Sequence, residues 1–566
     1  MELQIDRKSV LAQPGESLLE LVQKLHLDTG LLSSRPLAAQ IAGETFTLNY
    51  VPVRVDGQRV IRRAMEASAG NIRLLRYKDV HGRQVYERTA LFVLFLAVRQ
   101  LWPKAVAKMN FTVGGCLQIT IEKAPAFSGE DVSALRESIQ RIVASNIPLL
   151  RGRMATLEAV RFFERDGQPD KARLLTWRAV PYFDFYCYED YLDYFYGEML
   201  PSTGYLSVWD ICYGGKNSIF FQFPDKNDPD SVSKYREIPN FSAMFAESER
   251  WCQLMDCEVV ADLNDLVQSG GVRALIRVNE ALHERRFSQI ADEIIKRGAK
   301  AVLLAGPSSS GKTTSANRLA VQLRVHGKHP ILISLDDYYV DRDKIQPGPD
   351  GKLDLEHINT IDTALFRTHL ETLLSGGGVE LPRFSFQLGR RVQTGKMLKL
   401  SADSVILIEG LHGLNPLLLP EKLDRNSVFR IYVSPLIPLN LDHHNRIPTS
   451  YLRLLRRIVR DYETRGASVE ATLSMWDSVQ QGEERWIFPF QENADVIFNS
   501  SLIYELAVLK KQIFPLLTAV EPESPYYDDV RYIVKILNYI QEADVDDEIP
   551  PTSILREFIG GNSFYR

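Results

Sequence analysis

Residues 306–313 read Gly306-Pro307-Ser308-Ser309-Ser310-Gly311-Lys312-Thr313 and match the phosphate-loop pattern G-x-x-x-x-G-K-[ST]. An apolar run at 301–305 precedes them and a helical pattern begins near Thr313, which is the strand, loop and helix order that this motif requires. In such a loop Lys312 reaches the β- and γ-phosphates, Thr313 binds Mg²⁺, and the helix N-terminus attracts phosphate. We therefore predict ATP binding by residues 306–314, which include Thr314; a chance Gly/Ser turn is the alternative.

Short apolar runs alternate with helical patterns from residue 301 onward. The runs occupy residues 301–305, 331–335, 405–408 and 429–433. Strands that alternate with helices are typical of βαβ units, in which the strands are parallel. We therefore predict an α/β domain with a parallel sheet around the loop.

Acidic residues follow two of these predicted strands. Asp336 and Asp337 come directly after the run 331–335, and Glu409 comes directly after the run 405–408. The carboxyl ends of parallel strands are where ligands of open α/β folds bind. We predict that Asp336 accepts a proton from the acceptor hydroxyl and that Thr313, Asp336 and Glu409 hold Mg²⁺. The alternatives are a turn or helix N-cap for the aspartates and a capping role for Glu409.

A helical pattern over residues 452–461 carries four arginines on one face: Arg453, Arg456, Arg457 and Arg460. The opposite face is apolar. Like charges at i, i+3, i+4 and i+7 repel one another, so the spacing favours an anion partner. A solvated basic face and an RNA-binding patch are the alternatives.

The composition is that of a soluble globular protein with several domains. The chain has 566 residues, 45% hydrophobic and 25% charged, which at ~100–200 residues per domain indicates about three or four domains. Its net charge of −5 gives no overall positive field for nucleic acid. Five cysteines form no disulfide framework, and the longest strongly apolar run, 89–98, is about half a membrane span. We predict a cytoplasmic protein without membrane contact.

We divide the chain by its changes in pattern. Residues 1–60 are typical of a small α+β domain, and 61–225 of a second α+β domain with a helix at 86–102 and a strand at 117–121. Residues 226–290 are predicted to be a helical connector, 291–515 the phosphate-loop domain, and 516–566 a C-terminal extension. Within the extension, residues 553–561 are predicted to form a docked helix.

Residues 300–515 resemble the uridine kinase and phosphoribulokinase group of P-loop kinases. The resemblance rests on the phosphate loop, the aspartates before Tyr338 and Tyr339, the Leu355-Glu356-His357 element, the Pro382-to-Phe386 stretch, Glu409-Gly410, and the arginines up to Arg465-Gly466. It implies catalysis by Asp336, Lys312, Arg457 and Arg460, and nucleotide contacts by Arg456 and Arg465. It implies substrate contacts by Asp337, Tyr338, Tyr339, Glu356, His357, Phe384, Phe386 and Arg391. This sequence departs from uridine kinases at Gly389, in place of a base-contacting His, and at Glu356, in place of Asp.

The N-terminal half resembles two modules of threonyl-tRNA synthetase. Residues 1–60 are similar to its TGS domain, a β-grasp fold, and 85–223 to its second additional domain, which carries editing chemistry. At the places of that domain's metal and editing residues this chain has Arg88, Phe92, Phe195 and Met199. Phe and Met cannot replace imidazole or thiolate as ligands, so the resemblance implies neither zinc nor editing. We expect this cleft to bind an acidic ligand or an RNA end, and the kinase to remain active without residues 1–225.

The combination resembles a bacterial group of uridine kinase-like nucleoside kinases. It implies transfer of the γ-phosphate of ATP to a nucleoside such as uridine, giving the 5′-monophosphate. One alternative is an RNA- or tRNA-linked regulatory protein in which the P-loop module is a nucleotide switch. Another is a kinase whose acceptor is a sugar phosphate or an RNA-borne hydroxyl. A homo-oligomer is also among the expectations.

Overall fold

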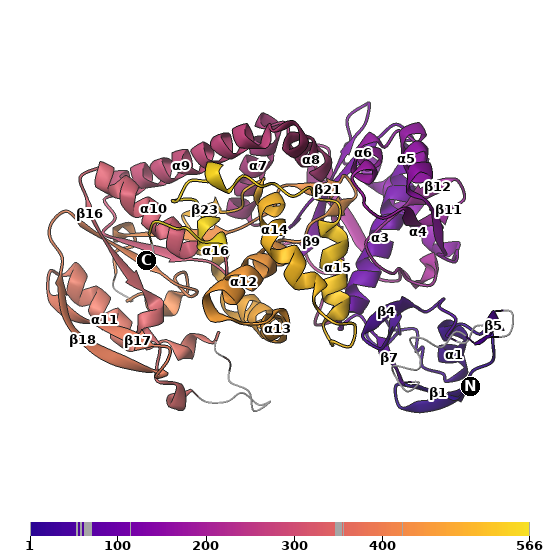
Figure 1. The fold of residues 1–566 in the computed structure, drawn as a ribbon, viewed down its shortest axis with the longest axis horizontal. Coiled ribbons are helices and arrows are strands. Elements are labelled where there is room, and N and C mark those ends of the chain that lie inside the picture. Colours follow the sequence, from indigo (N-terminus) through magenta and orange to yellow (C-terminus); the bar gives the residue numbers. More distant parts are fainter. Residues whose placement is uncertain are drawn as a thin grey trace.

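The computed structural model describes residues 2–52, 55–56, 59–60, 71–113, 115–345, 354, 356–420 and 423–564. Leu355 of the predicted Leu355-Glu356-His357 element lies outside this part of the chain. Figure 1 shows the phosphate-loop region and the N-terminal units at opposite ends, with long helices between them. In the described residues no helix is both long and apolar enough to cross a membrane.

The phosphate-loop region contains the predicted parallel sheet. Five strands lie in the order β16-β19-β15-β20-β23, and all neighbouring pairs are parallel. The strands are β15 (Ala301–Ala305), β16 (His329–Ser334), β19 (Ser404–Glu409), β20 (Val428–Ser434) and β23 (Val496–Asn499). The prediction of an α/β fold around the loop is therefore confirmed.

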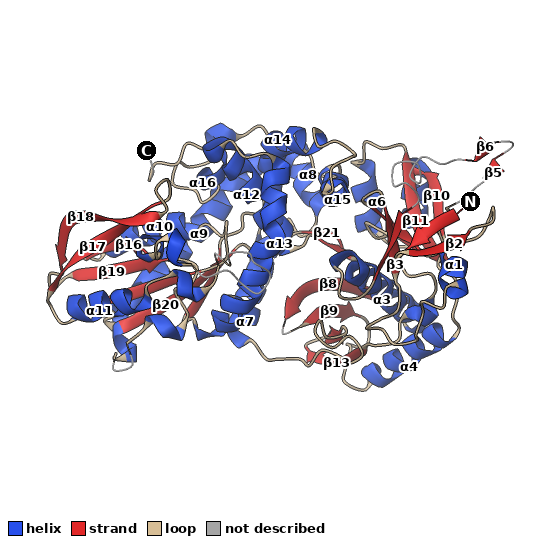
Figure 2. Cartoon of the chain, turned by 90° about the horizontal axis from the view of Figure 1, so that it is seen from below, coloured by secondary structure: helices blue, strands red, loops and turns tan. Residues whose placement is uncertain are grey.

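Helices cover both faces of this sheet because its central strand is apolar on both sides. Val302 and Leu304 face α9 (Val272–Arg297) and α10 (Lys312–Val325), while Ala301 and Leu303 face α11 (Thr363–Leu374). A strand's side chains alternate between faces, so a strand buried on both sides appears as a continuous apolar run. The hairpin of β17 (Gly378–Ser385) and β18 (Arg390–Lys399) lies beside α11 (Figure 2).

Further helices lie beside the sheet and in the middle of the molecule (Figure 1). They are α12 (Thr449–Arg465), α13 (Val469–Trp486), α14 (Glu505–Thr518), α15 (Tyr527–Leu537) and α16 (Arg556–Ile559). The docked C-terminal helix is confirmed, since Ile554 and Phe558 are buried among α9, α10 and the sheet. The predicted connector region forms α7 (Pro239–Leu254), α8 (Val260–Ser269) and the first part of α9.

The first sheet of the chain is mixed, in the order β2-β1-β7-β3-β4, with α1 (Leu18–Lys24) packed on it. Its strands are β1 (Glu2–Ile5), β2 (Lys8–Leu11), β3 (Ala38–Ile41), β4 (Glu44–Thr47) and β7 (Asn71–Leu75); β5 (Val55–Asp56) and β6 (Arg59–Val60) form a separate ladder. Because β7 is the central strand, the predicted boundary at residue 60 falls inside this unit.

The second unit is α+β. Its four-stranded sheet contains β8 (Val106–Val113), β9 (Cys116–Glu122), β13 (Asp210–Gly215) and β14 (Ser218–Gln222), and it packs on α3 (Val80–Leu101) and α4 (Asp131–Ala144). A three-stranded sheet of β10 (Arg151–Ala155), β11 (Tyr182–Tyr188) and β12 (Tyr191–Asp193) carries α5 (Thr156–Arg165) and α6 (Pro169–Thr176).

The second unit and the phosphate-loop region share one apolar core. Phe163 and Leu174 belong to the same buried cluster as Leu455, Leu509 and Ile540. The short hairpin of β21 (Asn440–Asp442) and β22 (Asn445–Arg446) lies at this junction.

Buried polar contacts also cross the junction. His444 stacks on Phe95 at 3.8 Å between ring centroids, and its Nδ1 lies 2.6 Å from Asp193 Oδ2. Lys171 Nζ lies 2.5 Å from Asp193 Oδ1, with both side chains fully buried. The expectation that the kinase survives removal of residues 1–225 therefore does not agree with the structure, because that cut would expose this core and leave His444 without its partners.

Candidate active site

The phosphate loop joins the end of β15 to the start of α10, and its backbone is folded for close approach. Ser309 and Gly311 have φ of 59° and 80°, in the left-handed region. A Cβ at Gly306 would lie 2.1 Å from the Val433 carbonyl oxygen, so only glycine fits there. Thr313 and Thr314 lie in the first turn of α10, where the helix dipole favours an anion.

Lys312 is buried next to several carboxylates. Its Nζ donates to the Pro307 carbonyl at 3.0 Å. Burial lowers the pKa of Lys312, and the charges of Glu409 and Asp336 oppose that shift. The ends of β15, β16 and β19 thus bring Lys312, Asp336 and Glu409 together, as their positions in the sequence predict.

The carboxyl groups around Lys312 have raised pKa values. Burial, followed by the charge of Asp336, raises the pKa of Glu409 to about 7, although Lys312 and the hydroxyl of Ser334 oppose the shift. Burial and the charge of Glu483 raise the pKa of Glu356 to about 7. Burial also raises the pKa of Asp336. Each of these carboxylates is destabilised as an anion, so a cation bound among them would be favoured.

The donor set suits Mg²⁺ in the presence of phosphate. Asp336 and Glu409 supply carboxylate oxygens and Thr313 a hydroxyl at the helix start. Across the described part of the chain, no three His, Cys, Asp or Glu side chains form a ready metal cage. Mg²⁺ in kinases is held by one or two protein carboxylates together with substrate phosphates, so an incomplete protein shell agrees with this chemistry.

Three arginines converge on one buried aspartate near the phosphate loop. Arg457 Nη1 donates to Ser308 Oγ at 3.1 Å, and its Nε lies 3.3 Å from Asp461 Oδ2. Arg460 and Arg465 lie 3.0 and 3.2 Å from Asp461 Oδ1. Three guanidinium groups against one carboxylate leave an excess of positive charge beside the loop. This excess is suited to phosphate oxygens.

The four arginines of residues 452–461 do not face one common anion, because two of them pair with buried carboxylates of the chain itself. Arg453 forms a bidentate pair with Glu483 at 2.6 Å for both bonds. Arg456 is fully buried; it pairs with Glu505 and donates to the Ser500 carbonyl at 2.9 Å. It reaches the loop only through the Ser309 carbonyl at 3.4 Å, so it supports the loop from behind rather than contacting nucleotide.

Several residues predicted to contact substrate are engaged by the protein instead. Asp337 Oδ1 accepts the Phe384 N–H at 3.2 Å, which ties the hairpin to β16. Tyr338 is 1% exposed, and its hydroxyl lies 3.1 Å from His369 Nδ1. Arg391 Nη2 pairs with Asp362 at 3.0 Å. His357 Nδ1 accepts the Asn359 N–H at 3.0 Å, and its ring packs on Trp486. All four side chains thus have partners within the protein, and their contact with substrate stays a prediction.

Three predicted substrate-contacting aromatics do form a cluster. Phe384 lies 5.6 Å from Tyr339 and 5.3 Å from Phe386 between ring centroids, at nearly edge-on angles. Phe386 is 57% exposed, so the cluster has one face open to solvent. Gly389 closes the turn with φ of 64°. The exposed ring of Phe386 offers an apolar surface of the kind on which a base stacks.

Three further side chains that were not predicted also lie at the site. Glu483 Oε1 accepts the Ser308 N–H at 3.0 Å. His412 is 1% exposed, neither ring nitrogen has a hydrogen-bond partner among the described residues, and burial lowers its pKa to about 4. Glu557 Oε2 accepts from Thr314 Oγ1 at 2.6 Å and from its N–H at 3.4 Å. His412 follows Glu409 by three residues, which was the one available signal.

The four residues that the synthetase resemblance places at metal and editing positions lie in the second unit. Phe92 and Met199 are fully buried in its core, and Phe195 packs against that core. Arg88 lies apart from them and lines a cavity. The four side chains therefore form no single polar site.

Known proteins resemble the phosphate-loop region. The model of the Phosphoribulokinase / Uridine kinase family matches residues 302–505. The uridine kinase of Vibrio atlanticus (strain LGP32) is 32% identical over 197 residues, which cover 34% of this chain and 84% of that protein. The chain belongs to the phosphoribulokinase/uridine kinase family.

Two further similarities concern the same family. The uridine kinase of Aliivibrio salmonicida (strain LFI1238) is 31% identical over 221 residues, covering 38% of this chain and 94% of that protein. A solved structure described as a possible uridine kinase from Bacillus stearothermophilus is 19% identical and covers 38% of this chain and 98% of that one, with a TM-score of 0.27. The family match and the two uridine kinases show that the C-terminal region is a P-loop kinase domain.

Proposed function

We propose that the protein transfers the γ-phosphate of ATP to a hydroxyl of a small molecule, most consistently a nucleoside such as uridine. The observation that carries this proposal is the meeting of Lys312, Asp336 and Glu409 at the sheet edge, with Arg457 bonded to the loop opposite them. These groups supply the charge, the proton acceptor and the metal ligand that phosphoryl transfer requires.

In this mechanism the loop 306–314 binds the ATP phosphates with its backbone N–H groups. Mg²⁺ held by Glu409, Asp336 and Thr313 would neutralise charge on the β- and γ-phosphates. Asp336 accepts the proton of the acceptor hydroxyl as that oxygen bonds to the γ-phosphorus. The bond between the γ-phosphorus and the bridging oxygen breaks, and ADP leaves. Lys312 and Arg457 stabilise the charge that develops on the transferred group.

Two features support a nucleoside as the acceptor. The cluster of Tyr339, Phe384 and Phe386 provides a stacking surface for a base. In the part of the chain that the structure describes, Glu356 Oε2 is buried beside Gly482 without a hydrogen-bond partner, so a sugar hydroxyl would satisfy it. Because Gly389 carries no side chain to read the base, we expect broad base specificity rather than strict selection of uridine.

A panel of nucleosides assayed for ADP release tests the proposal. Turnover should rise at least tenfold above ATP hydrolysis in water with one or more nucleosides, and a nucleoside 5′-monophosphate should accumulate. Sugar phosphates and bulk tRNA form the comparison arms. Faster turnover with either of these than with any nucleoside would overturn the choice of acceptor.

The N-terminal units remain part of the proposal as TGS-like and editing-like modules. The order of the first sheet, β2-β1-β7-β3-β4 with one helix, supports a β-grasp assignment. Contact with tRNA through these units is tested by gel shift with bulk tRNA. A shift that persists after residues of the first sheet's surface are changed would argue against that role.

A further inference from the structure

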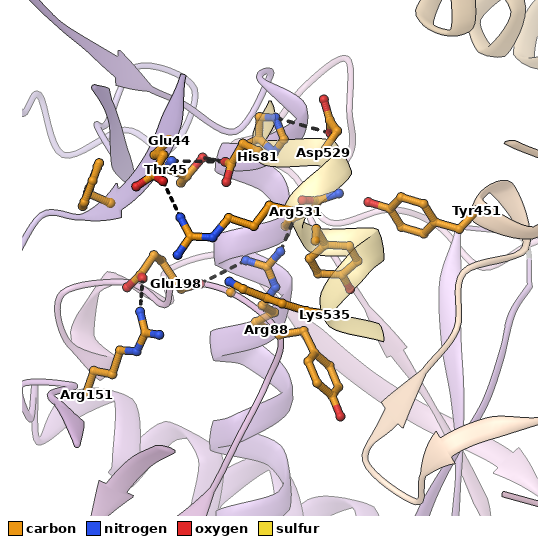
Figure 3. A pocket seen from close by; sticks show the side chains of 16 residues that line it. Glu44, Thr45, His81, Arg88, Arg151, Glu198, Tyr451, Asp529, Arg531 and Lys535 are labelled. Atoms are coloured by element: carbon orange, nitrogen blue, oxygen red, sulfur yellow. Dashed lines mark hydrogen bonds and ion pairs between the residues drawn. The ribbon is translucent and has the colours of Figure 1, made fainter. Parts of the chain in front are cut away.

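A small cavity lies where the first sheet, the second unit and the kinase region meet, far along the chain from the phosphate loop (Figure 3). Its walls come from β4, the start of α3, the turn at 196–198, Tyr451 of α12, and α15. Its volume is about 110 Å³, well below the roughly 300–1,000 Å³ of pockets for drug-sized ligands but above the space needed by one water. The size suits a small ion or the end group of a larger ligand.

All four acidic side chains of the cavity already have partners. Glu44 pairs with Arg531, and Glu198 Oε1 lies 2.6 Å from Arg151 Nη1. Asp529 lies 3.7 Å from His81 Nε2. Asp528 Oδ2 accepts from the hydroxyl and N–H of Thr45 at 2.7 and 3.1 Å. Glu44 and Glu198 are thus neutralised by arginines, whereas the contacts of Asp528 are with the neutral groups of Thr45 and Asp529 lies beside His81.

Two cations of the cavity have no carboxylate partner within ion-pair distance in the described residues: Arg88 and Lys535. Arg88 donates to the Glu198 carbonyl at 3.1 Å and to Gln84 Oε1 at 3.3 Å, both neutral acceptors. Burial, followed by the charges of Arg531 and Arg151, lowers the pKa of Lys535 to about 8, although the charges of Asp528 and Glu198 oppose the shift. Both groups are placed where an anion would stabilise them.

The backbone makes room for the Arg88 guanidinium. Gly197 has φ of 151°, and a Cβ there would lie 2.4 Å from Arg88 Nη1. Tyr532 packs against the guanidinium, with its ring centroid 5.8 Å from Cζ, and Tyr451 stacks on Tyr532 at 5.2 Å. The arginine is thus held in one orientation before any ligand arrives.

We propose that this cavity binds a phosphate-type oxyanion between Arg88 and Lys535. After its two bonds to neutral acceptors, Arg88 keeps three N–H donors, and Lys535 keeps three. Six donors and two positive charges match the four oxygens and the double charge of phosphate better than they match a single carboxylate. The ion is either free phosphate or the terminal phosphate of a monoester. The inference does not depend on the proposed kinase reaction.

Calorimetric titration of the full chain with inorganic phosphate tests the site. All titrations use a Lys312→Ala background, which removes the main anion contact of the phosphate loop. In this background we expect phosphate to bind. Arg88→Gln or Lys535→Gln should weaken that binding about 10- to 100-fold, the effect of losing a charged hydrogen-bond partner. Arg141→Gln, which changes an exposed arginine of α4, is the matched control and should leave binding unchanged.

Parallel titrations with ribose 5-phosphate distinguish the sources. Tighter binding of free phosphate assigns the site to the ion itself, and tighter binding of the sugar phosphate assigns it to a monoester. Either result supports the site if Arg88→Gln weakens the binding of that ligand. Circular dichroism and melting of each variant report whether it is folded. Equal phosphate binding by the folded Arg88→Gln, Lys535→Gln and Arg141→Gln proteins would overturn the proposal.

Discussion

At the scale of single residues, the site holds carboxyl groups in surroundings that oppose their charge. Glu409 titrates near 4.5 when exposed and at about 7 in the fold. The folded state therefore binds this proton more tightly than the unfolded state. The stability that the proton provides is complete below about 4.5 and is lost as the pH rises to 7. Such strain is typical of a site built for a cation rather than for stability.

Glu409→Gln should consequently stabilise the protein without ligand while removing its activity. At pH 8 we expect the free energy of unfolding to rise by about 3 kcal/mol, because the pKa of Glu409 is raised from 4.5 to about 7 in the fold. This gain should vanish at pH 4.5. Thermal melts of both proteins across this range measure it. Glu371→Gln, an exposed glutamate of α11, is the control and should change neither property. An unchanged melting temperature at pH 8 would contradict the explanation.

Glu557 holds a place at the start of α10 that suits a phosphate. Its carboxylate accepts from both the N–H and the hydroxyl of Thr314. Because nucleotide phosphate and this carboxylate are expected to compete for the same helix N-terminus, Glu557→Gln should lower the ATP dissociation constant about fivefold, an effect typical of a charge at a helix end. Fluorescent-nucleotide titration measures it, with Glu542→Gln as the exposed control. Weaker ATP binding by Glu557→Gln would show that the acid supports the loop instead.

At the scale of elements, α12 separates its arginines by function. Arg457 faces the loop, whereas Arg456 is fully buried against Glu505. We expect Arg457→Gln to lower kcat at least 100-fold with little change in melting temperature. Arg456→Gln should instead lower the free energy of unfolding by about 3–5 kcal/mol, because it leaves Glu505 buried without its partner. Kinetics and melting of the two variants, side by side, test this division; matching profiles would contradict it.

The strands were predictable from the sequence because their own residues carry the signal. The partners of the arginines were not predictable because they lie on other elements. Each strand of the parallel sheet is buried on both faces, so its own residues report its position, as in residues 301–305. The partners of Arg453 and Arg456 are Glu483 and Glu505, which lie on other helices. Local spacing shows that the arginines share a face but not what covers that face.

The polar face of α9 illustrates the same limit. Three polar residues are buried on this face: Asn279, Glu280 and His283. Their hydrogen-bond partners lie more than 200 positions away or on the next helix. Ile503, Tyr504 and Ser501 are the distant partners. A sequence pattern treats buried polar residues as exposed. The site residues at strand ends were found because topology alone places them together, whereas Glu483 and Glu557 required the fold.

At the scale of the whole molecule, the kinase region and the second unit are expected to unfold together. Lys171 and Asp193, fully buried, lie against His444 of the kinase region. Lys171→Met should lower the free energy of unfolding by about 3–5 kcal/mol. The temperature at which kinase activity is lost should fall by the same amount as the melting temperature of the whole protein. Lys104→Met, at an exposed position, should change neither.

Truncation gives a second view of the same coupling. A chain that begins at residue 226 should aggregate, because it exposes the apolar core that Leu455 and Ile540 share with Phe163. Size-exclusion chromatography and calorimetry measure this. A monomeric, active truncated kinase would show that the junction is dispensable.

The measurement that tests the central claim most directly compares Asp336→Asn with Asp337→Asn. Both changes remove one charge at the end of β16, but only Asp336 faces Lys312, while Asp337 accepts the Phe384 N–H. With the nucleoside that gives the fastest ADP release, we predict that Asp336→Asn lowers kcat by about 100- to 10,000-fold, the usual contribution of a general base, while ATP still binds. Asp337→Asn should keep kcat within about tenfold of the value for the unchanged protein. Near-normal turnover by Asp336→Asn would contradict the account.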